Sequence, residues 1–186
     1  ILKPTYYIVP DVLEDSEGTM HNMETWIENY KDKVDSECKM IGVVQGATYK
    51  DICDCYTYMD KKANVDKIAI PFDLSYYQWV FKHASKLVSW ACGRSLMLNC
   101  MLVEGIINVK KEHHLLGCGL AEEFAFYDSL NYPWISSVDT SNPVIAGLQK
   151  IRYEDNIGLT DKSSMKLYKL MLINVTDEQK ECIMHN

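Results

Sequence analysis

Five short runs of aliphatic, β-branched and aromatic residues constrain the fold of this chain more than any other feature of its sequence. They are residues 5–9, 39–44, 67–70, 114–119 and 134–138. Each run is largely apolar rather than alternating, which is typical of parallel strands covered on both faces. Segments with apolar residues at helical spacing separate the runs. The alternation predicts an α/β fold of parallel βα repeats, either an open doubly wound sheet or a barrel.

Helix signals fill the segments between these runs. Met20 and Met23 lie one helical turn apart, and Thr19 is a candidate N-cap residue for that helix. A second helix is expected to begin at Thr48. Gly93 is expected to end a third helix. The helices expected further along the chain span residues 75–90, 95–109 and 122–130.

The length and composition indicate one domain. The chain has 186 residues, of which 47% are hydrophobic, so it can bury a sizeable core. We expect residues 1–146 to form the βα-repeat, barrel-like part and residues 147–186 to continue the same domain. Residues 147–164 are rich in Gly, Asn, Asp and Ser and indicate an irregular excursion. A helix near residues 164–173 and a tail are expected to follow.

The cysteines and the apolar stretches bear on the compartment. The seven cysteines are odd in number and scattered, which favours free thiols in a reducing compartment, the cytoplasm. Charges interrupt every apolar stretch before the roughly 20 residues of a membrane span, so we expect no membrane partner.

The chain begins Ile-Leu-Lys-Pro, without an initiator Met or a signal-peptide pattern. We interpret it as a trimmed chain or a piece of a longer protein.

The acidic balance of the chain restricts its binding partners. A net charge of −7 disfavours a surface that binds nucleic acid through bulk electrostatics, because neutralising phosphates requires clustered Lys and Arg. The paired lysines of the sequence stand beside carboxylates and are typical of solvated helix ends. Any contact with nucleic acid would therefore depend on a local basic groove.

Polar residues and glycines gather where the predicted strands end. Because ligands of parallel α/β folds lie at the carboxyl ends of the strands, these residues are the candidate site. Carboxylates and an amide at one mouth suit acid–base catalysis, covalent catalysis or hydrogen bonding to a polar heterocycle. Alternatively, each Asp caps a helix or tightens a turn. The candidates are Asp11, Gln45, Gly46, Asp73, Gly117, Gly119 and Asp139, with Thr140 and Ser141 beside the last.

The histidines and cysteines are interpreted as structural. His113 and His114 precede a predicted strand, and metal ligation would require further ligands from elsewhere. Cys53 and Cys55 have no third cysteine at a suitable spacing, and Cys182 lies in a terminal tail with His185. We therefore predict no structural zinc and no cofactor.

Several ordered segments of the chain carry a family resemblance. They are Val9-Pro10-Asp11-Val12-Leu13, Gly42-Val43-Val44-Gln45-Gly46, Lys67-Ile68-Ala69-Ile70, Leu115-Leu116-Gly117-Cys118-Gly119 followed by Ala121-Glu122-Glu123, and Val138-Asp139-Thr140-Ser141. In order and spacing, over residues 5–145, they resemble the tRNA-guanine transglycosylases and the phage and bacterial DNA-modifying relatives of those enzymes. Each short motif alone matches many unrelated proteins, so the resemblance depends on their order.

The resemblance implies a TIM-barrel-like fold and a function. It makes Asp11 an acid that recognises a base, Gln45 and Gly46 polar contacts to the heterocycle, and Asp139 the attacking carboxylate. The implied reaction exchanges a guanine in tRNA or DNA for a 7-deazaguanine through a covalent aspartyl–glycosyl intermediate. The implied partners are a guanine or 7-deazaguanine base and the nucleic acid that carries it, in a host cytoplasm if the protein is phage-encoded.

The chain also differs from the family pattern. It lacks an Asp-Ser-Gly-Gly-Phe segment for the second catalytic acid, and five predicted strands are fewer than the eight of a closed barrel. We therefore expect an incomplete or truncated barrel. The alternative function is a non-catalytic module that binds a deazaguanine or a nucleotide, or a subunit that acts in a homo-oligomer or with a partner chain. A third interpretation is an unrelated open α/β enzyme.

Overall fold

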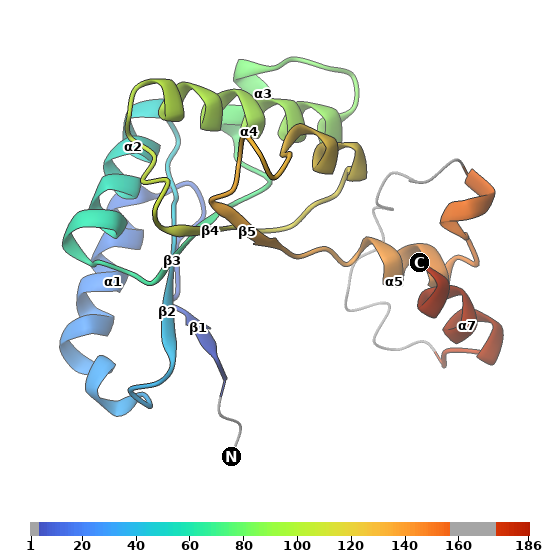
Figure 1. Ribbon diagram of the computed structural model, residues 1–186, viewed down its shortest axis with the longest axis horizontal. Coiled ribbons are helices and arrows are strands. Elements are labelled where there is room, and N and C mark those ends of the chain that lie inside the picture. Colours follow the sequence, from blue (N-terminus) through green and yellow to red (C-terminus); the bar gives the residue numbers. More distant parts are fainter. Residues whose placement is uncertain (1–3, 157–173) are drawn as a thin grey trace.

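A computed structural model describes residues 4–156 and 174–186 (Figure 1). Its centre is a five-stranded sheet in which every neighbouring pair of strands is parallel. The strands are β1 (Tyr6–Ile8), β2 (Lys39–Val43), β3 (Lys67–Ile70), β4 (Glu112–Leu115) and β5 (Ile135–Val138). All five predicted strands are confirmed, although β4 begins two residues before the predicted run and ends four residues earlier. The mixed α/β fold with parallel βα repeats is therefore confirmed.

The strands follow one another in chain order across the sheet, from β1 at one edge to β5 at the other. A doubly wound sheet reverses its strand order at a switch point, so this arrangement is not doubly wound. Connections between parallel strands are right-handed, and a consecutive order therefore places successive helices on the same face. Closure into a barrel is not shown, because the described strands form an open sheet with two edges.

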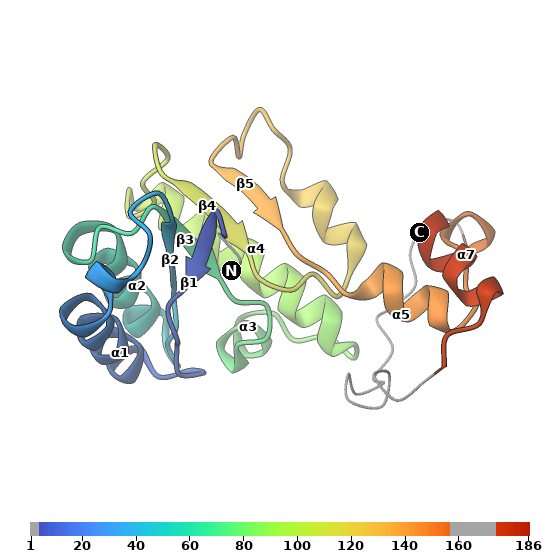
Figure 2. The same cartoon turned by 90° about the horizontal axis from the view of Figure 1, so that it is seen from below.

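The connections contain helices of very different length. The α-helices are α1 (Ser16–Asn29), α2 (Tyr49–Thr57), α3 (Ser75–Val80), α4 (Lys86–Val103), α5 (Asn142–Leu148) and α7 (Asp177–His185). A π-helical turn, η2 (Tyr58–Lys62), extends α2, and 3₁₀ turns are η1 (Lys31–Lys33), η3 (Ala121–Phe126) and η4 (Tyr153–Asn156). Figure 2 shows α1, α2, α3 and α4 arranged along the sheet and α5 and α7 beside each other at one end. Among the described residues, no helix has both the length and the apolar character that a membrane span requires.

The two faces of the sheet are packed differently. The main core joins alternate strand residues such as Met40, Ile68 and Ile70 to apolar side chains of the helices. The second face buries Ile41, Val43 and Ala69, and the apolar side chains packed against them are Tyr6 and Leu116. The prediction that helices cover both faces is therefore not met in the described residues. The apolar runs are continuous because short aliphatic residues on the second face pack against neighbouring strands.

The observed N-cap of α1 differs from the predicted one, whereas that of α2 is as predicted. Asp15, not Thr19, caps α1, and its side chain accepts a hydrogen bond from the Gly18 N–H. Thr19 is buried and its hydroxyl bonds the backbone of Val12, which fixes the loop after β1. The prediction for Thr48 is confirmed, because its side chain and that of Asp51 form a capping box.

The predicted helix at residues 75–90 is in fact two helices, and Gly93 ends neither of them. The first helix stops at Val80, and α4 then runs uninterrupted through Gly93. A Cβ at Gly93 would lie 2.5 Å from the carbonyl oxygen of Tyr77, so this glycine lets α4 pack closely against α3. The glycine at residue 93 therefore marks a close contact between two helices rather than the end of one.

The carboxyl-terminal segment contains more helix than expected. Residues predicted to form an irregular excursion include the end of α5 and η4, and the expected tail contains α7. Gly147 allows close packing of the two helices, since a Cβ there would lie 2.6 Å from the backbone of Ile183. The predicted helix near residues 164–173 lies outside the described residues. The predicted helix at residues 122–130 is instead the short 3₁₀ turn η3.

Candidate functional site

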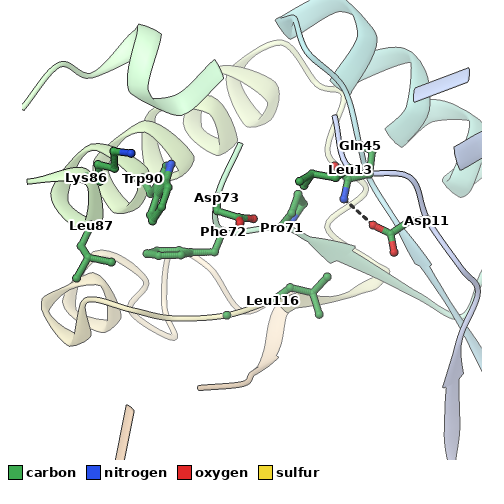
Figure 3. Close-up of a pocket in the computed structure, with 11 residues that line it drawn as sticks. Asp11, Leu13, Gln45, Pro71, Phe72, Asp73, Lys86, Leu87, Trp90 and Leu116 are labelled. Carbon is green, nitrogen blue, oxygen red and sulfur yellow. Dashed lines mark hydrogen bonds between the residues drawn. The ribbon is translucent and has the colours of Figure 1, made fainter. Parts of the chain in front are cut away.

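A cavity of about 640 Å³ lies where β2, β3 and β4 end. Figure 3 shows the Asp11–Gln45 pair toward one end of it and Trp90 and Lys86 toward the other. Three of the candidate polar side chains, those of Asp11, Gln45 and Asp73, line this cavity. The remaining lining residues are Leu13, Pro71, Phe72, Lys86, Leu87, Trp90, Leu116 and Gly117.

Gln45 is the fixed polar group of the cavity. Only 2% of it is exposed, and its Nε2 donates a 2.6 Å hydrogen bond to the carboxylate of Asp11 (Figure 3). Its Oε1 accepts from the backbone N–H of Glu14, whose own carboxylate accepts from the Ser75 N–H. Glu14 adopts a positive φ of 59°, an uncommon conformation outside glycine. The Gln45 amide thus joins the loops after β1 and β2, and the Glu14 carboxylate joins them to the start of α3.

An aromatic surface forms the opposite part of the cavity. The rings of Phe72 and Trp90 lie 5.5 Å apart in an edge-to-face arrangement, and Lys86 lies one helical turn before Trp90. Asp73 is exposed and forms no hydrogen bond or ion pair within the described residues. The cavity therefore combines an apolar, aromatic wall with two carboxylates, an amide and an ammonium group, a combination that suits a flat polar ligand.

A buried arginine fixes the backbone at the mouth of the sheet. Arg94 is fully buried and forms a bidentate pair with Glu123, with both N–O distances 2.8 Å. Its remaining N–H groups donate to the carbonyls of Ile70, Leu116 and Gly117. The carboxyl ends of β3 and β4 are therefore held by one side chain of α4, which the sequence analysis did not identify.

Asp139 lies at the end of β5, beside the cavity rather than among its lining residues. Its Oδ1 accepts hydrogen bonds from the Gly117 N–H at 2.9 Å and from Nε2 of His114 at 3.0 Å. Its Oδ2 accepts none from the described residues, and 60% of the side chain is exposed. The Thr140 hydroxyl does not bond this carboxylate, because it donates to the carbonyl of Cys118.

The three candidate glycines have different roles. Gly117 lines the cavity and has a φ of +58°, which favours glycine. Gly46 does not line the cavity; a Cβ there would lie 2.7 Å from the Ile52 nitrogen, so glycine allows α2 to start close to β2. Gly119 lies against Phe72 and Leu87, where a Cβ would meet both side chains, so glycine allows the chain to pack closely against the aromatic wall.

The structure therefore brings Asp11, Gln45, Asp73 and Gly117 to one cavity, while Asp139 contacts the cavity only through Gly117. All lie at the same end of the parallel sheet. Sequence reasoning missed Arg94, Glu123, His114 and the aromatic wall. Arg94 could have been found as the one charged residue inside the otherwise apolar and small-residue stretch 87–98. A charge within such a helix face requires a buried partner.

Cys118 is not an activated thiol. Burial, reinforced by the carboxylate of Glu123, raises the pKa of the Cys118 thiol to about 12. The sulfur donates to the Leu120 carbonyl.

Within the described residues, no three His, Cys, Asp or Glu side chains are grouped so that they could hold a metal ion. In comparisons with known proteins, no family model and no curated protein sequence matches this chain.

Proposed function

We propose that the cavity binds a guanine-type base and that the protein exchanges a guanine in RNA or DNA for a 7-deazaguanine. The observation that carries the proposal is the hydrogen-bonded Asp11–Gln45 pair, held at one end of a cavity whose other wall is aromatic. A carboxylate accepts hydrogen bonds from the N–H edge of guanine, and a flat ring gains from packing against Phe72 and Trp90. The order of the resembling sequence segments supports the same assignment.

Asp139 is the nucleophile of the proposed reaction. Oδ1 is held by two donors, and Oδ2 is exposed and accepts no hydrogen bond from the described residues. Oδ2 attacks C1′ of the nucleotide, the bond from C1′ to the base nitrogen breaks, and that nitrogen keeps the electron pair and takes up a proton from water. The incoming 7-deazaguanine gives the proton of its ring nitrogen to water, the nitrogen attacks C1′, and the bond from C1′ to the aspartate breaks to release the carboxylate. The five consecutive parallel strands would be part of a βα barrel in this proposal.

A second function is a module that binds the base without exchanging it. It is favoured by the position of Asp139, which does not line the cavity. The net charge of −7 also provides no general attraction to a nucleic acid backbone. In this alternative the Asp11–Gln45 pair and the aromatic wall bind free base, and Asp139 only fixes the turn after β5.

Calorimetry with guanine and 7-deazaguanine tests the binding step. We expect Asp11→Asn and Gln45→Ala each to weaken binding by about 5- to 150-fold, which corresponds to roughly 1–3 kcal/mol for an unpaired polar group. Asp54→Asn, on the exposed surface of α2, is the matched control and should bind like the wild type. Equal binding by wild type and both cavity variants would exclude this cavity as the base site.

Covalent trapping tests the exchange step. Wild type mixed with a guanine-containing RNA or DNA oligonucleotide should form an adduct that survives a denaturing gel and is identified by mass spectrometry. Asp139→Asn keeps the shape of the side chain and should form none. Base binding without an adduct or exchange in the wild type would favour the binding module, and an adduct with Asp139→Asn would exclude Asp139 as the nucleophile.

A further inference from the structure

A row of hydrogen-bonded polar side chains crosses the second face of the sheet and ends at Asp139. Lys67 on β3 lies 3.3 Å from the hydroxyl of Ser137 on β5. That hydroxyl lies 2.8 Å from Nδ1 of His114 on β4, and Nε2 of the same ring lies 3.0 Å from Oδ1 of Asp139. Glu112 pairs with Lys67 at 3.1 Å. Three strands thus contribute to one chain of contacts.

The direction of this chain follows from its two ends. The ammonium of Lys67 can only donate, so Ser137 Oγ accepts from it, and the carboxylate of Asp139 can only accept, so Nε2 of His114 donates to it. A neutral ring with its proton on Nε2 accepts at Nδ1, so the Ser137 hydroxyl donates to Nδ1. Every donor in the row therefore points toward Asp139.

The row is built from the sheet itself. The side chain of Lys67 is 9% exposed and that of His114 is 16% exposed, whereas that of Asp139 is 60% exposed. The contacts therefore begin in a shielded part of the sheet and end at the open mouth. Lys67 also lies 4.6 Å from the ring centre of Tyr6, which restricts where its ammonium can move. Strand-borne groups hold a geometry more closely than loop-borne groups do.

We propose that His114, fixed by Ser137 and Lys67, is a positioning residue for Asp139. With the Gly117 N–H it holds Oδ1, and Oδ2 accepts no hydrogen bond from the described residues. The inference depends on the proposed base exchange, and His114 itself contacts neither substrate. Its role is the orientation of the attacking carboxylate, for which a displacement of about 1 Å can reduce the rate on the order of 100-fold.

Paired substitutions at one position separate positioning from packing. Gln at residue 114 can place an amide N–H near the site of Nε2, whereas Phe fills the volume without a donor. We expect His114→Phe to reduce the rate of adduct formation about 100-fold, with base affinity within twofold of wild type. His114→Gln should recover most of that loss. Thermal unfolding of both variants checks that they fold.

Long-range ¹H–¹⁵N spectra of the histidine rings give a second readout that requires no substrate. In the neutral ring of His114 the proton should lie on Nε2, and Ser137→Ala should shift the Nδ1 resonance. A proton on Nδ1 of His114, or equal adduct rates for wild type and His114→Phe, would overturn the positioning role while base exchange stands. Covalent labelling of Ser137 by a fluorophosphonate would overturn it as well, since that hydroxyl would then act as a nucleophile. A wild type without exchange or adduct would instead overturn the proposed function on which the role depends.

Discussion

His113 and His114 are neighbours on β4 and point to opposite faces of the sheet, where they meet different surroundings. His113 is fully buried on the helix-covered face, stacked on Tyr56 and edge-to-face with Trp134. Its Nδ1 lies 2.9 Å from the Lys111 carbonyl and must donate to it, while Nε2 faces the Tyr56 hydroxyl at 2.8 Å. His114, on the second face, has the opposite arrangement, with Nε2 toward Asp139.

The comparison shows that the two faces of β4 differ in their surroundings: one is buried in the core, and the other leads to the candidate site. The covered face is apolar and encloses His113 between two hydrogen-bond partners, so changes there should affect folding. The second face carries charged and polar groups that reach the exposed mouth, so changes there should affect the site more than the fold. Substitutions on the two faces can therefore test whether this division holds.

Glu123→Gln is expected to have the largest effect on stability. It leaves the buried guanidinium of Arg94 without its counter-charge, and breaking a buried pair by removing one partner costs about 3–5 kcal/mol. Urea unfolding followed by circular dichroism measures the loss. A loss below about 1 kcal/mol would mean that the Arg94–Glu123 ion pair is not formed in solution. The double variant Arg94→Met with Glu123→Leu is the control and should regain most of the stability.

The pH dependence of stability should single out His113. Burial lowers its pKa in the folded protein to about 4, whereas an unfolded histidine titrates near 6.5. Below about pH 6.5 the unfolded chain binds a proton at His113 that the folded chain does not bind. The free energy of unfolding therefore falls as the pH is lowered to about 4, and below that pH His113 causes no further change. The contribution is roughly 3 kcal/mol. The free energy of unfolding of wild type minus that of His113→Gln, measured across this pH range, gives the contribution of His113. Parallel unfolding curves for wild type and His113→Gln between about pH 6.5 and pH 4 would contradict the burial of an uncharged His113 ring.

Gly93→Ala tests the packing of the covered side. The new Cβ would lie 2.5 Å from the Tyr77 carbonyl oxygen and 2.6 Å from the Tyr77 Cβ, so α3 and α4 must separate. Overpacking of this kind costs about 1–3 kcal/mol, although alanine is the better helix former. Thermal unfolding measures the change. Stabilisation by Gly93→Ala would show that the two helices are not in close contact.

Lys67→Met should have the smallest effect on stability, although it removes a charge from the sheet. Its partner Glu112 is largely exposed, and such pairs contribute about 1 kcal/mol or less. Urea unfolding at low and high salt checks this. A loss as large as that of Glu123→Gln would mean that the second face is as important to folding as the covered one.

The sequence predicted the strands well and the helices less well, for physical reasons. Continuous apolar runs such as residues 68–70 identify buried parallel strands, and polar residues after such runs identify the mouth. The same runs did not reveal that the second face packs against strand side chains. Gly93 has the signature of a helix end, yet its close approach to Tyr77 depends on a neighbouring helix that local patterns do not contain.

The candidate site was predicted in its strand-end members but not in its supports. Asp11, Gln45, Asp73 and Gly117 follow strands and were found by position alone. Arg94 was missed because its partners are carbonyls and a carboxylate more than 20 residues away, a relation that spacing does not show. His114 was interpreted as structural because its partners Ser137 and Asp139 become neighbours only through the pairing of β4 with β5.

The buried guanidinium of Arg94 also has a consequence for the order of folding. It bonds carbonyls at the end of β3 and just after β4 and a carboxylate of η3, so its partners come from three segments that must all be in place before its charge is compensated. Closing those long loops precedes any gain from the contacts. The mouth of the sheet should therefore assemble late, after α4 has docked. In native-state hydrogen exchange, the amides of Gly117 and Cys118 should open together with those of α4 rather than as an independent loop.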